Sequence, residues 1–325
     1  MSGVQHKAVS EDEEGMRLDR WFNAHFPEVK HGRLEKMLRK GEIRVGGGRV
    51  KANRRLEIGE EIRIPPLGEP RADHKKTLRV SEEGASKLRE MIIFEDDHLI
   101  ALNKPFGLAV QGGAKTFQHV DGMLGALGEG EARPKLVHRL DKDTGGLLLV
   151  AKTRKAAQAL SDGFKTQKIQ KTYWALVAGA PELKEGTINL PIAQQMVRHK
   201  EGQTERVIPD GNETGKRAET MFQTVESLGP ISFLAMKPIT GRKHQLRVHA
   251  AVMECPIIGD GKYGGDSAQI EGVSNKMHLF CRSMTFKHPA TGRMMTLSAD
   301  LTGHMKTTWA YFNFETNPKI EWPEL

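Results

Sequence analysis

The residues best suited to chemistry lie in the segment 138–152. Asp141 stands in a polar turn that leads to Gly145 and then to the apolar run 147–150, which is typical of a buried strand. A carboxylate on a turn beside a rigid strand is well placed for chemistry. A purely structural alternative is that Asp141 and Asp143 organise the turn through hydrogen bonds to their own backbone.

Two more candidates lie far from this segment in the sequence. Tyr173 falls in the stretch 171–177, whose alternation predicts a strand with Tyr173, Ala175 and Val177 on one face. A tyrosine on a strand is ordinarily a packing residue, so Tyr173 alone predicts little. Arg247 stands at the entrance of a predicted helix.

Residues with metal-binding side chains do not form a convincing site. His244 and His249 lack the spacing that places two ligands on one helix face, and no carboxylate completes the set. Cys255 and Cys281 are the two cysteines, and they form no C-x-x-C pair. The sequence therefore predicts no metal site.

Four blocks of the chain, in this order, carry a family resemblance. The segment 138–152 reads His-Arg-Leu-Asp-x-x-Thr-x-Gly followed by Ala-Lys, and the other blocks are 104–110, 170–177 and 237–264. Together they resemble the RluA-type pseudouridine synthases, enzymes that isomerise uridines in structured RNA. The resemblance implies an α+β fold whose catalytic domain has a mixed, largely antiparallel sheet with flanking helices, and it implies no cofactor.

The same resemblance implies a role for each candidate residue. Asp141 would be the catalytic carboxylate, which either attacks C1′ or removes the 2′ proton; the residues leave both paths open. Tyr173 would stack on a flipped-out uracil, and Arg247 would pair with Asp141 and keep it ionised. Arg139 would occupy the space that the flipped base leaves.

Charge is concentrated near the start of the chain. The net charge is +8, and residues 15–66 carry 13 Lys and Arg against 7 Asp and Glu, a net +6. This stretch predicts two helices, the second closed by Gly41, followed by two short strands, and it resembles the S4 RNA-binding domain, although Gly32 stands where that family more often has a serine. The basic residues expected on phosphates are Arg33, Lys36, Arg39 and Lys40.

Composition shifts predict the domain boundaries. We expect a disordered tail over 1–14, an S4-like domain over 15–66, a linker over 67–88 and the catalytic domain over 89–325. No apolar run approaches the ~20 residues of a membrane span, and the start lacks the pattern of a signal peptide. A cytoplasmic monomer that does not enter membranes is expected.

The expected partner is RNA. The resemblance to family members that carry an S4 domain implies large-subunit ribosomal RNA as the substrate. One alternative is a non-catalytic RNA-binding or ribosome-assembly factor with the same fold. Another, a glycosidase, lacks a convincing second carboxylate.

Overall fold

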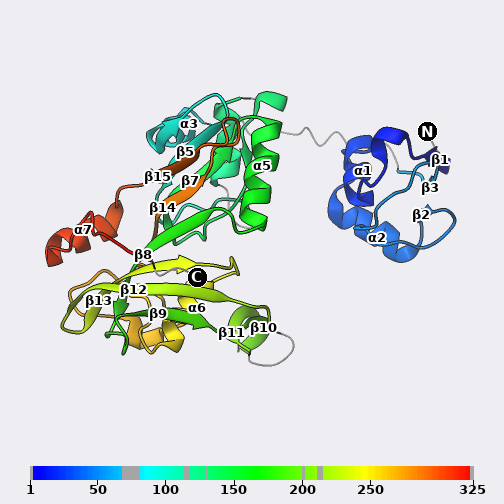
Figure 1. The fold of residues 1–325 in the computed structure, drawn as a ribbon. Coiled ribbons are helices and arrows are strands. Elements are labelled where there is room, and N and C mark those ends of the chain that lie inside the picture. Colours follow the sequence, from blue (N-terminus) through cyan, green and yellow to red (C-terminus); the bar gives the residue numbers. More distant parts are fainter. Residues whose placement is uncertain are drawn as a thin grey trace. The chain divides into compact units, whose positions relative to one another are not determined.

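The chain forms two compact units, residues 1–77 and 78–325, which are described separately (Figure 1). The structure is a computed structural model. The residues that it describes are 3–67, 81–112, 118–128, 130–199, 202–210 and 215–322.

The N-terminal unit combines two helices with a small antiparallel sheet in the order β1-β3-β2. Its elements are β1 (Gln5–Ala8), a 3-10 turn (Glu11–Glu13), α1 (Leu18–His25), α2 (His31–Lys40), β2 (Arg44–Val45) and β3 (Glu61–Ile64). The two helices bury the apolar residues that recur at helical spacing, with Trp21 and Phe22 fully enclosed. Gly41 ends α2 in the left-handed conformation, as its position predicts. At the other end of α2, Lys30 supplies no side-chain cap.

The predicted disordered tail, 1–14, is wrong for residues 5–14. Strand β1 pairs along its length with β3, Val9 is buried in the core of the unit, and Glu13 forms an ion pair with His25 on α1. These partners lie far along the chain. Because the order comes from non-local contacts, the polar composition of the segment did not reveal it.

The predicted linker, 67–88, is too long at its C-terminal end. Helix α3 (Glu82–Glu90) begins inside it, and the Ser81 hydroxyl accepts a hydrogen bond of 3.1 Å from the Gly84 amide as an N-cap. Leu88 on this helix is fully buried. The high charge of the segment masked its short apolar face, while residues 68–80 lie outside the described residues.

The second unit is built on a ten-stranded mixed sheet, β4-β5-β7-β14-β8-β13-β12-β9, with β15 paired to β14 and β6 paired to β7. Strands β7 and β14 run parallel, and the other strand pairs described are antiparallel, as the family resemblance implied. The strands are β4 (Ile92–Glu95), β5 (Leu99–Lys104), β6 (Lys135–Leu136), β7 (Gly145–Ala151), β8 (Gln170–Ala178), β9 (Glu185–Asn189), β12 (Glu219–Leu228), β13 (Ile231–Pro238), β14 (Leu279–Lys287) and β15 (Met294–Ser298).

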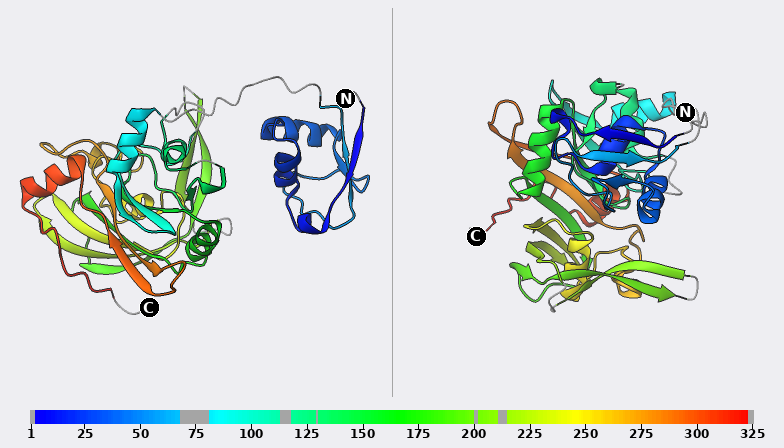
Figure 2. Two further views of the ribbon diagram at one scale, coloured as in Figure 1. Left: turned by 90° about the horizontal axis from the view of Figure 1, so that it is seen from above. Right: turned by 90° about the vertical axis from the view of Figure 1, so that its right-hand side faces the viewer.

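Helices flank this sheet and a separate hairpin extends from it. The helices are α3, α4 (Val120–Met123), α5 (Arg154–Lys165), α6 (Gln245–Val252) and α7 (Gly303–Phe312), with 3-10 turns at Leu124–Ala126, Gly130–Ala132 and Gly265–Ala268. The hairpin consists of β10 (Ile192–His199) and β11 (Gly202–Pro209), and it projects from the body of the unit (Figures 1 and 2).

Strand β8 separates two apolar cores. Trp174 and Leu176 belong to the larger core, whereas Ala175 and Val177 pack with Leu246 of α6 on the opposite face. The alternation predicted for this strand is therefore confirmed. As a result, β8 and α6 are fixed against each other near the point where the predicted site residues lie.

Candidate active site

A cavity of about 490 Å³ in the second unit gathers the residues that the sequence singled out for chemistry. Asp141, Tyr173, Arg247 and Arg139 all line it, although they come from three separate segments. The other lining residues are Val137, His138, Leu140, Thr144, Phe164, Lys165, Lys171, Pro238, Thr240, Gly241, Arg242, Lys243, His244, Gln245, Leu246 and Leu279.

Hydrogen bonds from Thr144 and Lys104 hold the turn that carries Asp141. The Thr144 amide donates a hydrogen bond of 3.1 Å to the Asp141 carbonyl, immediately before β7 begins. Lys104, which is fully buried, donates from its ammonium to three backbone carbonyls, including that of Lys142 at 3.3 Å. Burial lowers the pKa of Lys104 to about 8, against the opposing charges of Asp143 and Asp141.

Strand β14 lies between β7, which follows the turn of Asp141, and β8, which carries Tyr173. Its Cys281 is aligned with Gly146 on one side and with Tyr173 on the other. Gly146 has φ of 103°, and a Cβ atom there would lie 2.3 Å from the Cys281 carbonyl oxygen. The second glycine of the Gly-Gly pair is therefore required for the close approach of β7 and β14.

Tyr173 presents a ring to the cavity and keeps its phenolic proton. Removal from water raises the pKa of Tyr173 well above its ordinary value, and the nearby Cys281 thiol adds to this shift. Burial likewise raises the pKa of Cys281 to about 12. A phenol in this setting is a poor base at neutral pH, so the geometry favours stacking over proton transfer for Tyr173.

The expected direct pair between Arg247 and Asp141 is wrong. Arg247 forms a bidentate pair with Asp260, with Nε to Oδ2 at 2.7 Å and Nη2 to Oδ1 at 2.6 Å. Although burial opposes it, the hydrogen bonds and charge of Asp260 raise the pKa of Arg247, and Asp141 adds a smaller electrostatic contribution. Asp260 lies in a turn with no periodic pattern, so no feature of the sequence predicts it as the partner of Arg247.

His244 approaches the Asp141 carboxylate, with Nε2 lying 3.6 Å from Oδ2. In the sequence, His244 stands out only as a possible metal ligand. His249 points elsewhere, with its ring nitrogens 3.0 Å from the Thr220 hydroxyl and 3.1 Å from the Leu190 carbonyl. The two histidines therefore do not converge on a common point.

Gln245 fixes the loop that enters α6. Its amide oxygen accepts hydrogen bonds from the Thr240 hydroxyl at 2.7 Å and the Arg242 amide at 3.0 Å. Its amide nitrogen donates to the Glu219 carbonyl at 2.9 Å. Because Gln245 is buried and its amide is hydrogen-bonded at both the oxygen and the nitrogen, it holds the cavity wall formed by 238–247 in place.

Comparison with known proteins identifies the family of this arrangement. The model of the family described as RNA pseudouridylate synthase matches residues 98–252. The chain is 35% identical to the ribosomal large subunit pseudouridine synthase C of Vibrio vulnificus (strain CMCP6) over 92% of this chain and 93% of the relative. For the protein of the same name from Escherichia coli (strain K12), the identity is 35% over 93% and 95%. The chain belongs to the RNA pseudouridylate synthase family.

Solved structures agree with this assignment. The human RNA pseudouridylate synthase domain containing 4 protein matches with a TM-score of 0.59 and 25% identity, over 73% of this chain and 99% of that one. The human domain containing 1 protein has a TM-score of 0.53 at 22% identity, over 70% and 96%, which shows a shared fold. The chain is thus an RNA pseudouridine synthase, an isomerase of uridine in RNA.

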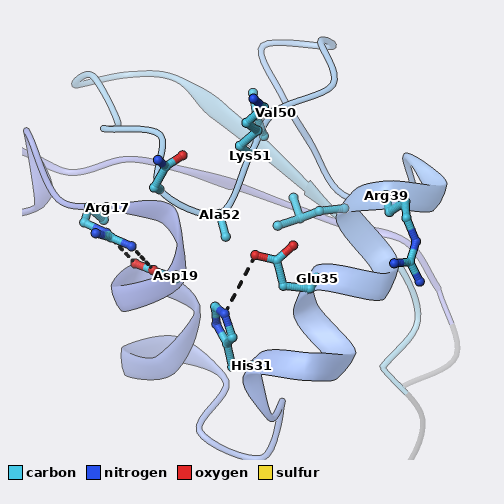
Figure 3. Close-up of a pocket in the computed structure, with 10 residues that line it drawn as sticks. Arg17, Asp19, His31, Glu35, Arg39, Val50, Lys51 and Ala52 are labelled. Carbon is cyan, nitrogen blue, oxygen red and sulfur yellow. Dashed lines mark hydrogen bonds and ion pairs between the residues drawn. The ribbon is translucent and has the colours of Figure 1, made fainter. Parts of the chain in front are cut away.

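A second cavity, of about 520 Å³, lies in the N-terminal unit of the synthase. Figure 3 shows the ion pair of Arg17 and Asp19 at the start of α1, and the pair of His31 and Glu35 on α2, which are 3.7 Å apart. The remaining lining residues are Leu38, Arg39, Val50, Lys51, Ala52 and Asn53. We call this cavity the N-terminal groove.

The groove includes one of the four basic residues expected on phosphates. Arg39 lines it, whereas Arg33 donates to the Leu67 carbonyl at 2.5 Å and Lys40 lies 3.5 Å from Glu42. Lys36 is exposed on the same helix, outside the groove lining. Arg17, Lys51 and Asn53 also line the groove, and no helical pattern predicted them, because they belong to the loop before α1 and to the irregular segment before β3.

No helix in the described part of the chain has both the length and the apolar character needed to cross a membrane.

Proposed function

We propose that this synthase isomerises uridines of large-subunit ribosomal RNA with Asp141 as the catalytic carboxylate. The RNA substrate follows from relatives that carry that activity in their names and align over more than nine-tenths of both chains. The observation that supports the role of Asp141 most strongly is its place in the cavity. Its side chain, 30% exposed, shares this space with Tyr173 and with the basic residues Arg139 and Arg247.

The reaction exchanges one glycosidic bond for another. The N1–C1′ bond breaks, the uracil turns within the cavity, a C5–C1′ bond forms, and the proton on C5 leaves while N1 gains one. Asp141 serves either by bonding to C1′ and being displaced again, or by taking the 2′ proton and returning it. Neither route requires a change of oxidation state or a net addition of water.

The other cavity residues hold the base. The Tyr173 ring offers a stacking face to the uracil, and its hydroxyl stays protonated because its pKa is raised. Arg139 is exposed at the cavity and is suited to fill the gap that the flipped nucleotide leaves in the RNA.

The N-terminal unit is proposed as an S4-like module that binds RNA phosphates. The net charge of +6 over 15–66 supports this role, and Arg39 and Lys51 are exposed in the groove. The exposed cations of α2 outside the groove, Arg33, Lys36 and Lys40, would add weaker contacts. We further propose that the synthase acts as a monomer in the cytoplasm.

Mapping pseudouridines across ribosomal RNA tests the substrate. Cells that lack the protein should lose pseudouridine at specific positions of the large-subunit RNA. Expression of the wild-type chain should restore those positions, and expression of Asp141→Asn should not. If the large-subunit RNA were fully modified without the protein, the proposed substrate would be wrong. If Asp141→Asn restored modification, the proposed catalytic residue would be wrong.

A further inference from the structure

Three successive contacts link the β10–β11 hairpin through Tyr263 and His244 to Asp141, the proposed catalytic residue. The Val207 amide of β11 donates to the Tyr263 hydroxyl at 3.3 Å, and that hydroxyl lies 2.7 Å from Nδ1 of His244. On the far side of the imidazole, Nε2 faces Oδ2 of Asp141 at 3.6 Å. Both ring nitrogens of His244 therefore have a defined neighbour.

The backbone of His244 shows that the surrounding structure imposes this placement. His244 has φ of 54° and ψ of 17°, in the left-handed region that residues other than glycine rarely adopt. Its side chain is only 12% exposed, and its ring meets the Tyr263 ring edge to face, with centroids 5.6 Å apart. Strain of this kind persists where neighbouring contacts fix the residue, and it is concentrated at functional sites.

The hydrogen-bond partners select one tautomer of the ring. The Tyr263 oxygen already accepts the Val207 N–H, so its own hydrogen is available for Nδ1 of His244. The opposite tautomer would direct the lone pair of Nε2 at the Asp141 carboxylate. We therefore propose that Tyr263 holds His244 as the tautomer protonated at Nε2, and that this N–H positions the Asp141 carboxylate for reaction.

The electrostatic surroundings keep the ring neutral. Burial lowers the pKa of His244 to about 4, Asp141 opposes this shift, and the charges of Arg247, Lys262 and Lys243 add to it. A neutral imidazole that donates from Nε2 can orient a carboxylate without transferring a full proton to it. The distance of 3.6 Å is too long for a hydrogen bond in the free protein, and such contacts commonly tighten in the substrate complex.

His244 is thus a positioning residue, and this inference rests on the proposed catalytic role of Asp141. When Nε2–H engages Oδ2, the second oxygen of the carboxylate is directed to the ribose. Tyr263 acts one step further out. Asp260 supports it, because Oδ1 of Asp260 accepts the Tyr263 amide at 3.2 Å as well as one arm of Arg247.

The test uses full-length variants that differ at the donor. In His244→Gln the amide nitrogen can replace the Nε2 donor. His244→Leu introduces an apolar side chain of similar size that has no hydrogen-bond donor. His249→Gln is the control, since this histidine lies on α6, which begins directly after His244, but bonds to Thr220 and Leu190. Each folded variant is assayed for RNA affinity and for single-turnover isomerisation at saturating enzyme.

We expect His244→Leu to lose about 100-fold in the single-turnover rate with unchanged RNA affinity, the size of effect that a misplaced reactive group produces. His244→Gln should recover most of that loss, and His249→Gln should keep the wild-type rate. A wild-type rate in His244→Leu, or equal losses in the leucine and glutamine variants, would overturn the proposal.

The tautomer has a test of its own that does not require an active variant. Two-bond ¹H–¹⁵N spectra of the labelled wild-type protein should show His244 protonated at Nε2 and unprotonated at Nδ1, and Tyr263→Phe should shift the Nδ1 signal. A proton on Nδ1 would refute the inference. If Asp141→Asn were active, the proposed function would fail instead, whatever the spectra show.

Discussion

The two units of the synthase each contain a bidentate arginine–aspartate pair, and the pairs differ in burial rather than in chemistry. In the N-terminal groove, Arg17 bonds to Asp19 at 3.1 and 2.5 Å, with the side chains 45% and 15% exposed. Beside the active-site cavity, Arg247 bonds to Asp260 at 2.7 and 2.6 Å, with exposures of 9% and 1%. Water screens the first pair and is excluded from the second.

The exposed pair is therefore suited to binding RNA, whereas the buried pair has a structural role. A solvated arginine such as Arg17 can exchange its carboxylate for an RNA phosphate at small cost. Arg247 cannot leave Asp260 without exposing a buried charge to an apolar setting. Asp260 also accepts hydrogen bonds from the backbone amides of Lys262 and Tyr263, so it ties Arg247 to the turn that follows Asp260.

Removing each arginine separates the two pairs most sharply. Arg247→Met leaves Asp260 buried and uncompensated, so the free energy of unfolding should fall by about 3–5 kcal/mol. Arg17→Met, the matched control, should leave the denaturation midpoint unchanged because its partner is hydrated. Both are measured by chemical denaturation of the full chain. Equal midpoints for the two variants would mean that burial does not distinguish these pairs.

The stacking role of Tyr173 is tested by two substitutions that differ only in the ring. Tyr173→Ala should weaken RNA affinity by about 1–3 kcal/mol, the contribution of stacking on one base. Tyr173→Phe should keep the wild-type affinity, because it loses only the hydroxyl and keeps the stacking face of the ring. Binding to one RNA fragment measures both. Equal affinities would eliminate stacking, and a large loss of turnover in Tyr173→Phe would assign a proton to the hydroxyl.

Salt dependence measures how many phosphates the N-terminal groove contacts. Neutralising Arg39 and Lys51 to glutamine together should reduce the slope of log affinity against log salt by about 1.4 on single-stranded or 1.8 on duplex RNA, at ~0.7 or ~0.9 per contact. Lys287→Gln, an exposed cation on β14, serves as the control and should leave the slope unchanged. An unaltered slope in the double variant would exclude the groove as a phosphate-binding surface.

The smallest expected effect concerns Glu254, the second residue after α6. Glu254 has φ of 59°, a left-handed conformation that a glycine adopts without strain. Glu254→Gly should therefore raise the free energy of unfolding by about 0.5–1 kcal/mol while leaving turnover unchanged. Thermal unfolding detects the shift. A lower melting temperature would show that other contacts of Glu254 outweigh the relief of strain.

Local patterns in the sequence predicted several elements of the fold correctly. Apolar periodicity predicted α1, α2 and β8, and Gly41 marked the end of α2. Each of these depends on neighbours in sequence or on one steric demand. Order in 5–14 and the early start of α3 were missed because partners far along the chain create them.

The sequence predicted which residues lie in the site but not which of them pair with each other. Asp141, Tyr173 and Arg247 were expected in one cavity, and they line one. The predicted partner of Arg247 was wrong. Both Asp141 and Asp260 interact with its guanidinium, and no sequence pattern shows which of them forms the ion pair. His244 was missed as a neighbour of Asp141 since its position depends on a left-handed backbone that composition does not reveal.

The most direct test of the central claim follows the C5 hydrogen of the substrate. RNA carrying [5-³H]uridine releases tritium when pseudouridine forms, and saturating enzyme in a single turnover removes any difference in affinity. Asp141→Asn should bind this RNA with nearly wild-type affinity and release no tritium above background, because it keeps the shape of the side chain and loses its charge. Measurable tritium release by Asp141→Asn would contradict the assignment of this carboxylate as the catalytic group.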